Sequence, residues 1–193
     1  MPSSMTMPAS PLACLLEAYQ AKAPSLFLLM GPSGSGKTSW CQAAARLAGG
    51  RRWSVAGLLS PAVMVDGRKA RIDLLDLGSG ERRRLATHQE VLAGDETAAG
   101  GVITGNWHFD PQTLAWGNSM LAGIGRCDLL IIDELGPLEF RQRQGLQAGL
   151  ALLDARQHLA CVTIRPSLAD AAQRRWPWGQ LITLTEGHPG GIR

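Results

Sequence analysis

The sequence has few of the features that mark nucleic-acid-binding, membrane and secreted proteins. Its 193 residues carry a net charge of only +3, which does not favour a nucleic-acid partner. No apolar run approaches the roughly 20 residues that a membrane-spanning helix needs. Residues 1–10 contain no basic segment of the kind that begins a secretory signal. We therefore expect a cytoplasmic protein without membrane association.

The cysteines are few and scattered. None belongs to a C-x-x-C motif or to a Cys/His pair at metal-ligand spacing, which argues against a zinc site. Their arrangement instead predicts small buried thiols in a reducing compartment. The four positions are Cys14, Cys41, Cys127 and Cys161.

Strand-like and helix-like segments alternate along the chain, which predicts βαβ units and a mostly parallel sheet flanked by helices. Apolar runs predict strands at 26–30, 55–59, 102–109, 129–132, 159–164 and 181–184. Helices are expected at 11–21, 37–48 and 110–124, after the turn at 136–137, and from a Ser167 cap to about 176. We expect a single α/β domain over residues 1–193, with terminal tails at 1–9 and 186–193.

Residues 61–88 follow a different pattern. Asp66-Gly67 separates two strand-like runs, which is a hairpin signal, and Gly78-Ser79-Gly80 marks a second turn. This segment predicts a small antiparallel β-hairpin flap inserted into the α/β core.

A glycine-rich segment follows the first predicted strand and opens a helix. Gly31-Pro32-Ser33-Gly34-Ser35-Gly36-Lys37-Thr38 matches the P-loop motif G-x-x-x-x-G-K-[ST] at every fixed position. Such a loop points backbone N–H groups at the phosphates of a nucleoside triphosphate, and the following helix adds its positive N-terminus. Lys37 supplies a charge to the outer phosphates, and the Thr38 hydroxyl is a hard oxygen ligand for Mg²⁺. The predicted nucleotide site runs from Gly31 to Ser39.

Two carboxylates end the second strongly apolar strand. Asp133 and Glu134 follow Leu129–Ile132, at the strand edge where parallel sheets bind ligands. We expect Asp133 to hold Mg²⁺, mostly through water, and Glu134 to orient or deprotonate the attacking water. The N-K-x-D segment through which many GTPases read guanine is absent, which favours proteins that carry a catalytic Glu after the metal-binding Asp.

Charge builds up on the phosphate oxygens as the γ-phosphoryl group leaves, so an arginine would assist catalysis. Arg165 is one candidate, because it would point towards the phosphates if its strand neighbours that of Asp133. Arg141 and Arg143, just after the Asp133 loop, are the others. Thr163, near the same edge, is a candidate to polarise the γ-phosphate.

Together these segments resemble a known family. The P-loop, Gly57–Pro61 leading into the Asp66-Gly67 hairpin, and the stretch from Leu129 to Glu139 (LLIIDELGPLE) are similar to bacterial and archaeal nucleoside-triphosphatases of the THEP type. The resemblance implies a P-loop fold close to the RecA and nucleotide-kinase groups. It also implies slow Mg²⁺-dependent hydrolysis of several nucleoside triphosphates to diphosphate and phosphate.

The sequence departs from that family in two places. The flap reads Gly67-Arg68-Lys69-Ala70-Arg71-Ile72 where relatives often have Gly-x-Arg-x-Gly-Phe. Glu186-Gly187-His188 stands where an Asn-Arg pair often follows the last strand. We expect the loop 185–189 to border the base and to discriminate little among bases.

Two other functions remain open from the sequence alone. A nucleotide or small-molecule kinase would use the same P-loop, with Arg82–Arg84 clamping an acceptor. A nucleotide-switched adaptor would bind a protein partner and hydrolyse little. Glu134 favours water as the acceptor, so hydrolysis is the leading prediction.

Overall fold

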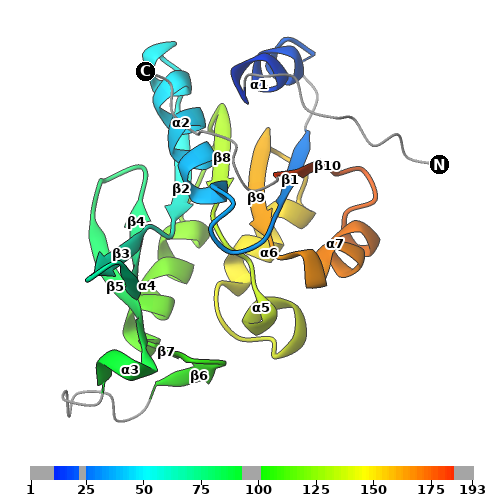
Figure 1. Ribbon diagram of the computed structural model, residues 1–193. Coiled ribbons are helices and arrows are strands. Elements are labelled where there is room, and N and C mark those ends of the chain that lie inside the picture. Colours follow the sequence, from blue (N-terminus) through cyan, green and yellow to red (C-terminus); the bar gives the residue numbers. More distant parts are fainter. Residues whose placement is uncertain (1–10, 22–24, 93–100, 185–193) are drawn as a thin grey trace.

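The structure is a computed structural model that describes residues 11–21, 25–92 and 101–184. Within these residues ten strands form one sheet, which is parallel in one half and antiparallel in the other (Figure 1). Helices cover both faces of the parallel half. The predicted α/β fold with a mostly parallel central sheet is confirmed.

The parallel half carries the ends of the strands that matter for function. Its strand order is β10-β1-β9-β8-β2, so β9 lies between β1 and β8. Every residue of β8 and β9 is buried, as expected for strands covered on both faces. The strands are β1 (Leu26–Met30), β2 (Val55–Leu59), β8 (Leu129–Ile132), β9 (Ala160–Ile164) and β10 (Gln180–Thr183).

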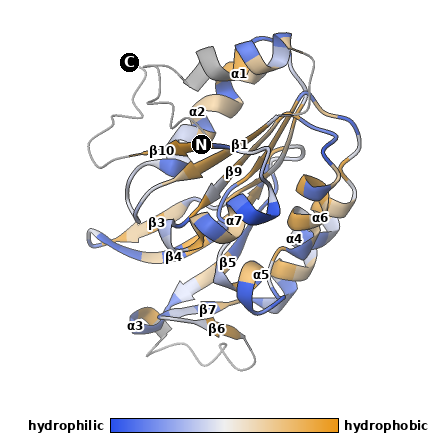
Figure 2. Ribbon diagram, turned by 90° about the vertical axis from the view of Figure 1, so that its right-hand side faces the viewer, coloured by the Kyte–Doolittle hydropathy of each residue, from blue (hydrophilic) through white to orange (hydrophobic). Residues whose placement is uncertain are grey.

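Two hydrophobic clusters lie on the two faces of this sheet. One joins α1 and α2 to alternate strand residues such as Leu29 and Ile131. The other joins α4, α6 and α7 to the intervening residues, such as Leu28 and Ile132. Figure 2 shows the apolar strands enclosed between these helices. The helices are α1 (Pro11–Gln20), α2 (Lys37–Gly50), α4 (Pro111–Ala122), α6 (Gln147–Asp154) and α7 (Ala169–Arg175).

The predicted flap extends the main sheet. β4 pairs antiparallel with β2, through Leu58 opposite Asp76 and Leu59 opposite Leu75, so the hairpins continue the sheet beyond β2. Both turns predicted from glycine signals are present, between β3 and β4 and between β4 and β5. We call β3–β7 the antiparallel arm. Its elements are β3 (Ala62–Val65), β4 (Arg68–Asp76), β5 (Arg82–His88), the short helix α3 (Gln89–Leu92), β6 (Val102–Thr104) and β7 (Trp107–Phe109).

Some expected elements differ from the structure. Residues 102–109 are not one strand, because the chain reverses at Gly105, which has a φ of 58°, and β6 pairs back on β7. One expected helix after Gly136 is two, the short α5 (Pro137–Arg141) and α6, since the chain turns at Gly145 with a φ of 73°. Ser167 does not cap α7: it lies inside a 3₁₀ turn (Pro166–Leu168), and Leu168 precedes the helix.

Helix α2 also runs further than expected. The glycines at 49 and 50 are its last two residues, and the left-handed backbone comes later, at Arg52 with a φ of 63°. None of the helices in the described ranges is both long and apolar enough to cross a bilayer.

Candidate active site

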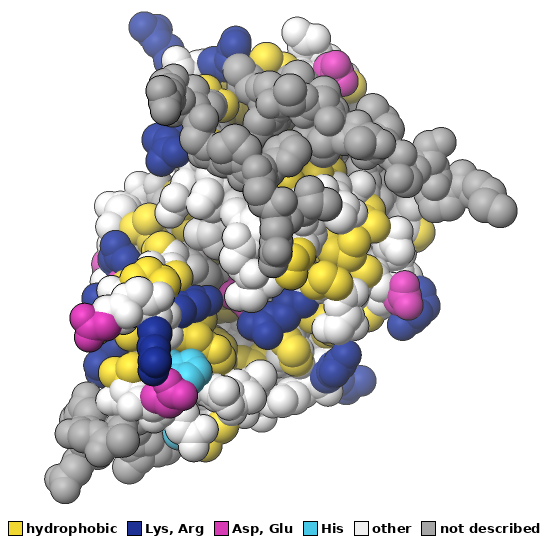
Figure 3. Space-filling view, viewed as in Figure 1, with side chains coloured by type: hydrophobic (Ala, Val, Ile, Leu, Met, Phe, Trp, Pro, Cys, Tyr) yellow, Lys and Arg dark blue, Asp and Glu magenta, His cyan; other side chains and the backbone are white. Residues whose placement is uncertain are grey.

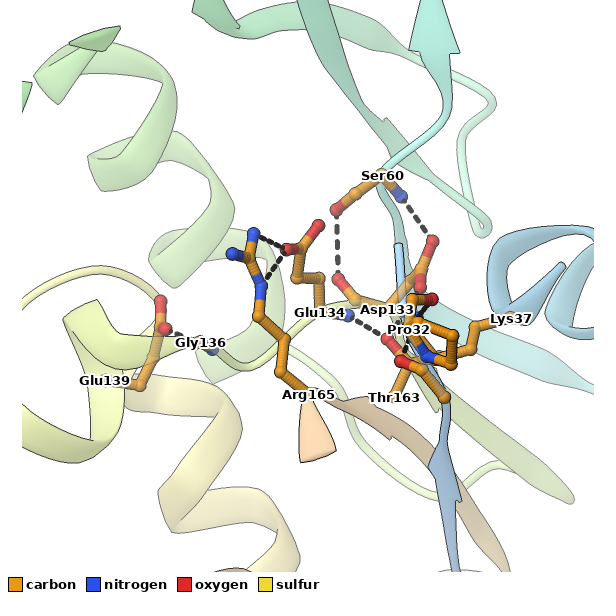
Figure 4. Close-up of polar contacts among 10 residues, drawn as sticks. Pro32, Lys37, Ser60, Asp133, Glu134, Gly136, Glu139, Thr163 and Arg165 are labelled. Carbon is orange, nitrogen blue, oxygen red and sulfur yellow. Dashed lines mark hydrogen bonds and ion pairs between the residues drawn. The ribbon is translucent and has the colours of Figure 1, made fainter. Parts of the chain in front are cut away.

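The P-loop connects β1 to α2 and is built by backbone geometry. Gly34 and Gly36 have φ values of 84° and 87°, in the left-handed region that glycine tolerates. The Lys37 ammonium donates to the carbonyl oxygens of Gly31 and Pro32, each at 2.7 Å, so it folds back across the loop (Figure 4). A Cβ on Gly31 would come within 2.3 Å of the Ser35 Oγ, which explains glycine there.

The predicted nucleotide-contacting side chains differ in exposure. Pro32, Ser33 and Ser39 are exposed, whereas Ser35 is buried. The Ser35 hydroxyl oxygen has no hydrogen-bond partner in the part of the chain that the structure describes. The P-loop therefore contains a buried hydroxyl oxygen that no described residue hydrogen-bonds.

Asp133 lies at the end of β8 and is only 1% exposed. Its carboxylate accepts hydrogen bonds from the Ser60 backbone N–H at 3.1 Å and from the Thr163 hydroxyl at 2.8 Å. Thr38 of the P-loop lies close enough to lower the pKa of Asp133. Burial is the larger effect and raises the pKa of Asp133 above its usual range; Thr38, the Ser60 N–H and the Thr163 hydroxyl lower the pKa, and the nearby Glu134 carboxylate raises it. Thr38 of the P-loop is thus a neighbour of the carboxylate that ends β8.

These donors fit the chemistry of Mg²⁺. Thr38 and Asp133 offer two hard oxygen ligands that lie near each other, as an ion shared by a hydroxyl and a carboxylate needs. Across the described ranges no group of three or more His, Cys, Asp or Glu side chains forms a cage for a metal. The arrangement suits an ion held by one or two protein oxygens, by water and by substrate phosphates.

Glu134 has an unusual backbone. Its φ is 69°, in the left-handed region that is costly for a residue with a Cβ. The Glu134 N–H donates to the Thr163 hydroxyl oxygen at 2.7 Å, which holds the turn after β8 in place. This turn directs the Glu134 side chain away from β8 and towards Arg165 (Figure 4).

Arg165 meets Glu134 because β9 is the parallel neighbour of β8. Its Nε and Nη2 both donate to Oε1 of Glu134, at 3.1 and 2.5 Å. The strand that ends at Arg165 therefore neighbours the strand that ends at Asp133, which was the condition for Arg165 to point towards the phosphates. Arg141 and Arg143 are exposed, and the Arg141 guanidinium donates to the Ser167 carbonyl at 3.4 Å, away from this pair.

Thr163 lies at the sheet edge where it was expected, near the end of β9 and in contact with Asp133. It is fully buried, and its hydroxyl both donates to Asp133 and accepts from the Glu134 N–H. It positions both carboxylate residues, and its suggested effect on the γ-phosphate stays a prediction. The sequence also gave no sign of the Ser60 contact, because Ser60 is 73 positions from Asp133.

Glu139 links the segments that follow the site. Its buried carboxylate accepts the N–H groups of Gly136 and Leu146, both at 2.7 Å. Burial raises the pKa of Glu139, and these hydrogen bonds oppose the shift. Glu139 therefore fixes the turn between α5 and α6, a structural role that the sequence left undefined.

A cavity of about 650 Å³ opens beside Glu134 and Arg165. It extends from Ser33 of the P-loop to the β6–β7 hairpin and is bounded by the antiparallel arm and α5. Figure 3 shows basic and hydrophobic side chains together on this face of the molecule. The sequence did not predict this cavity, because its walls come from segments with no shared motif.

Arg82–Arg84, suggested as an acceptor clamp, do not line this cavity. They border a separate groove that also includes Val63 and Arg71, and Arg82 is paired with Asp73 at 2.6 Å. The loop expected to border the base, 185–189, lies outside the described residues.

Comparison with solved structures supports the fold. The solution structure of a human cancer-related nucleoside triphosphatase has a TM-score of 0.64 at 21% identity, covering 86% of this chain and 92% of that chain. The crystal structure of THEP1 from Aquifex aeolicus has a TM-score of 0.60 at 16% identity, covering 86% and 94%.

Sequence comparisons identify the family. Nucleoside-triphosphatase THEP1 of Thermococcus kodakarensis is 28% identical over 157 residues, which cover 80% of this chain and 82% of that protein. The same-named protein of Caldivirga maquilingensis is 26% identical over 155 residues, covering 80% and 83%. A family model described as NTPase matches residues 26–186. Since the match spans most of the sequence, the chain belongs to this NTPase family, and the resemblance to THEP-type proteins is confirmed.

Proposed function

We propose that this protein is a Mg²⁺-dependent nucleoside-triphosphatase that acts in the cytoplasm on several nucleoside triphosphates, yielding the diphosphate and phosphate. One observation carries the proposal: Lys37 of the P-loop, Asp133 at the end of β8 and the Glu134–Arg165 pair lie together at one edge of the sheet (Figure 4). Phosphate-binding, metal-binding and water-activating groups thus lie on one edge of the sheet. The family's naming as nucleoside-triphosphatases supports the same activity.

The phosphates would be bound by the P-loop. Its N–H groups and the start of α2 attract negative charge. The Lys37 ammonium, which now donates to the Gly31 and Pro32 carbonyls, lies close enough to exchange these partners for phosphate oxygens. Thr38 and Asp133 would hold Mg²⁺, which supplies positive charge to the phosphate oxygens when it is bound.

Glu134 would hold the attacking water and accept its proton. Its side chain is 30% exposed, so water reaches it, and its direction is set by Thr163 and Arg165. Arg165 uses two donors on Glu134, and a guanidinium has five, so it can also contact a phosphate oxygen as charge develops. We therefore assign catalytic roles to Lys37, Glu134 and Arg165.

The proposed site recognises chiefly what all nucleoside triphosphates share. Reading one base over another needs fixed donors and acceptors that are left unpaired by the wrong base. The sequence lacks the N-K-x-D segment that supplies them in many GTPases. We expect kcat/KM values for ATP, GTP, CTP and UTP within roughly tenfold of one another, which is about 1.4 kcal/mol.

Release of inorganic phosphate from the four nucleotides, with Mg²⁺ and no added acceptor, tests the proposal. Multiple turnovers on all four support it, and a thousandfold preference for one base would overturn the broad specificity. Release only when an acceptor is added indicates a kinase. A single turnover with retained product indicates a nucleotide-switched adaptor.

A further inference from the structure

The cavity beside Glu134 is much larger than hydrolysis requires. One water molecule occupies about 30 Å³ in the liquid. The cavity measures about 650 Å³, which is the size of sites that bind small organic molecules. Because it reaches both Ser33 and Glu134, an occupant would lie next to the triphosphate of a bound nucleotide.

The outer end of the cavity is apolar and aromatic. Trp107 and Phe109 of β7 line it with apolar side chains of the arm, α4 and α5. The His88 ring meets the Trp107 ring edge-on, with 5.1 Å between the ring centroids. This contact helps to fix the orientation of the indole, so the cavity offers an ordered aromatic wall to a flat ligand.

The charges in the cavity leave one strong cation without an acidic partner. Glu134 is paired with Arg165, and Glu139 is occupied by two backbone N–H groups. Arg68 and Glu90 are 3.9 Å apart and mostly exposed, so their attraction is weak.

Lys69 forms no ion pair with any residue in the described ranges. Its Nζ lies over the Trp107 ring, 5.1 Å from the ring centre, in a cation–π contact with the aromatic wall. A ligand that stacks on this wall would therefore place an acidic group within reach of the Lys69 ammonium.

One polar atom in the wall also has no partner. The Thr104 hydroxyl oxygen is buried and makes no hydrogen bond within the part of the chain described. Thr104 lines the cavity near Trp107. A buried hydroxyl without a partner is costly, and a polar atom of a ligand would satisfy it.

We propose that this cavity binds a second small molecule, a flat aromatic compound with an acidic group, alongside the nucleotide. Its rings pack against Trp107 and Phe109, its acid pairs with Lys69, and Thr104 hydrogen-bonds to one of its polar atoms. Its position next to the γ-phosphate rests on the proposed function, whereas binding itself does not.

The probe is 8-anilinonaphthalene-1-sulfonate, an aromatic sulfonate whose fluorescence rises in apolar surroundings. It is titrated into the full-length protein with saturating Mg²⁺–ADP, which keeps it out of the nucleotide site. We expect one probe molecule per chain. Lys69→Met keeps most of the apolar stem and removes the charge, and should weaken binding about tenfold. Trp107→Leu should also weaken it.

Arg84→Met is the matched control. It removes one positive charge from the neighbouring strand β5, outside the cavity, and should leave the probe affinity unchanged. Circular dichroism shows whether each variant is folded. Absence of binding, or equal weakening by Lys69→Met and Arg84→Met, would overturn the proposal.

A second measurement separates this proposal from the proposed function. A probe in the cavity should exclude water from Glu134 and slow phosphate release at saturating nucleotide. Binding that depends on Lys69 without any change in phosphate release would support the second site. The same result would count against Glu134 as the group that activates water.

Discussion

Two guanidinium nitrogens of Arg165 donate hydrogen bonds to a single carboxylate oxygen of Glu134, at 3.1 and 2.5 Å. The pair is partly exposed, with side-chain exposures of 48% for Arg165 and 30% for Glu134. Solvent screening makes such a pair a small contributor to stability, so we interpret its role as one of orientation and catalysis.

Replacing Arg165 should therefore affect turnover more than folding. We expect Arg165→Ala to lower kcat by about 10²-fold or more. The variant lacks the guanidinium that would donate hydrogen bonds to the negative charge developing on the γ-phosphate oxygens. Arg165→Lys keeps the positive charge but has a single nitrogen in place of the two that donate to Glu134, so it should recover only part of the lost kcat. Steady-state kinetics with thermal unfolding checks both, and unchanged kcat in Arg165→Ala would remove it from the catalytic set.

Two substitutions of Glu134 separate its chemistry from its backbone. Glu134→Gln and Glu134→Gly both remove the base, and should slow turnover by roughly 10²- to 10⁴-fold while nucleotide binding persists. Because φ at this position is 69°, the glycine variant should be about 1 kcal/mol more stable than the glutamine variant. Chemical denaturation measures the difference, and equal stabilities would show that the backbone there is not strained.

Thr163 should act by positioning its neighbours. Thr163→Val keeps the shape but removes the partner of the Glu134 N–H and the Thr163 hydrogen bond to Oδ1 of Asp133, costing about 1–3 kcal/mol. kcat should fall, and Thr163→Ser should restore much of it. Thr183→Val, at the exposed end of β10, is the control and should change neither quantity. A Thr163→Val enzyme with normal kcat would contradict this role.

Thr38 and Lys37 should respond differently to metal. Thr38→Ala removes the hydroxyl proposed to bind Mg²⁺ beside Asp133 and should raise the Mg²⁺ concentration needed for half-maximal activity. Lys37→Ala should lose most nucleotide binding at any Mg²⁺ concentration, since charge-assisted contacts to phosphate are strong. Chelation with EDTA should abolish turnover of the parent protein. Activity and nucleotide binding are measured as functions of the Mg²⁺ concentration. If Lys37→Ala binds nucleotide as tightly as the parent, the assignment of the phosphate site is wrong.

Gly145 and Glu139 should depend on each other for folding. A Cβ at Gly145 would lie 1.9 Å from Oε1 of Glu139, so Gly145→Ala should destabilise the fold by at least about 2 kcal/mol. Gly80 has a nearly equal φ, 75° against 73°, and open space where its Cβ would be. Gly80→Ala thus reports the backbone cost alone. If the two variants lose the same stability in denaturation, the contact with Glu139 has no energetic role.

The sequence predicted best where a local pattern has one physical meaning. The apolar run of β8, which ends in two carboxylates, was predicted as a buried strand and is one, and the P-loop spacing allows few alternatives. The prediction was less accurate where a turn residue interrupts an apolar run. Residues 102–109 were predicted as one strand, but Gly105 reverses the chain and β6 pairs back on β7. Arg165 could be placed near the phosphates only on the condition that its strand neighbours that of Asp133, its ion pair with Glu134 was not predicted, and the cavity around Lys69 and Trp107 had no sequence signal.

The junction between β2 and β3 connects the antiparallel arm to the Asp133 carboxylate. Ser60 donates its N–H to the Asp133 carboxylate and its hydroxyl to the Asp133 carbonyl. The next residue, Pro61, accepts the N–H of Asp73 in β4 at 3.0 Å. Two successive residues, Ser60 and Pro61, thus hydrogen-bond to Asp133 on one side and to β4 on the other. The sheet that forms the cavity wall and the carboxylate beside the P-loop therefore share one continuous hydrogen-bonded connection.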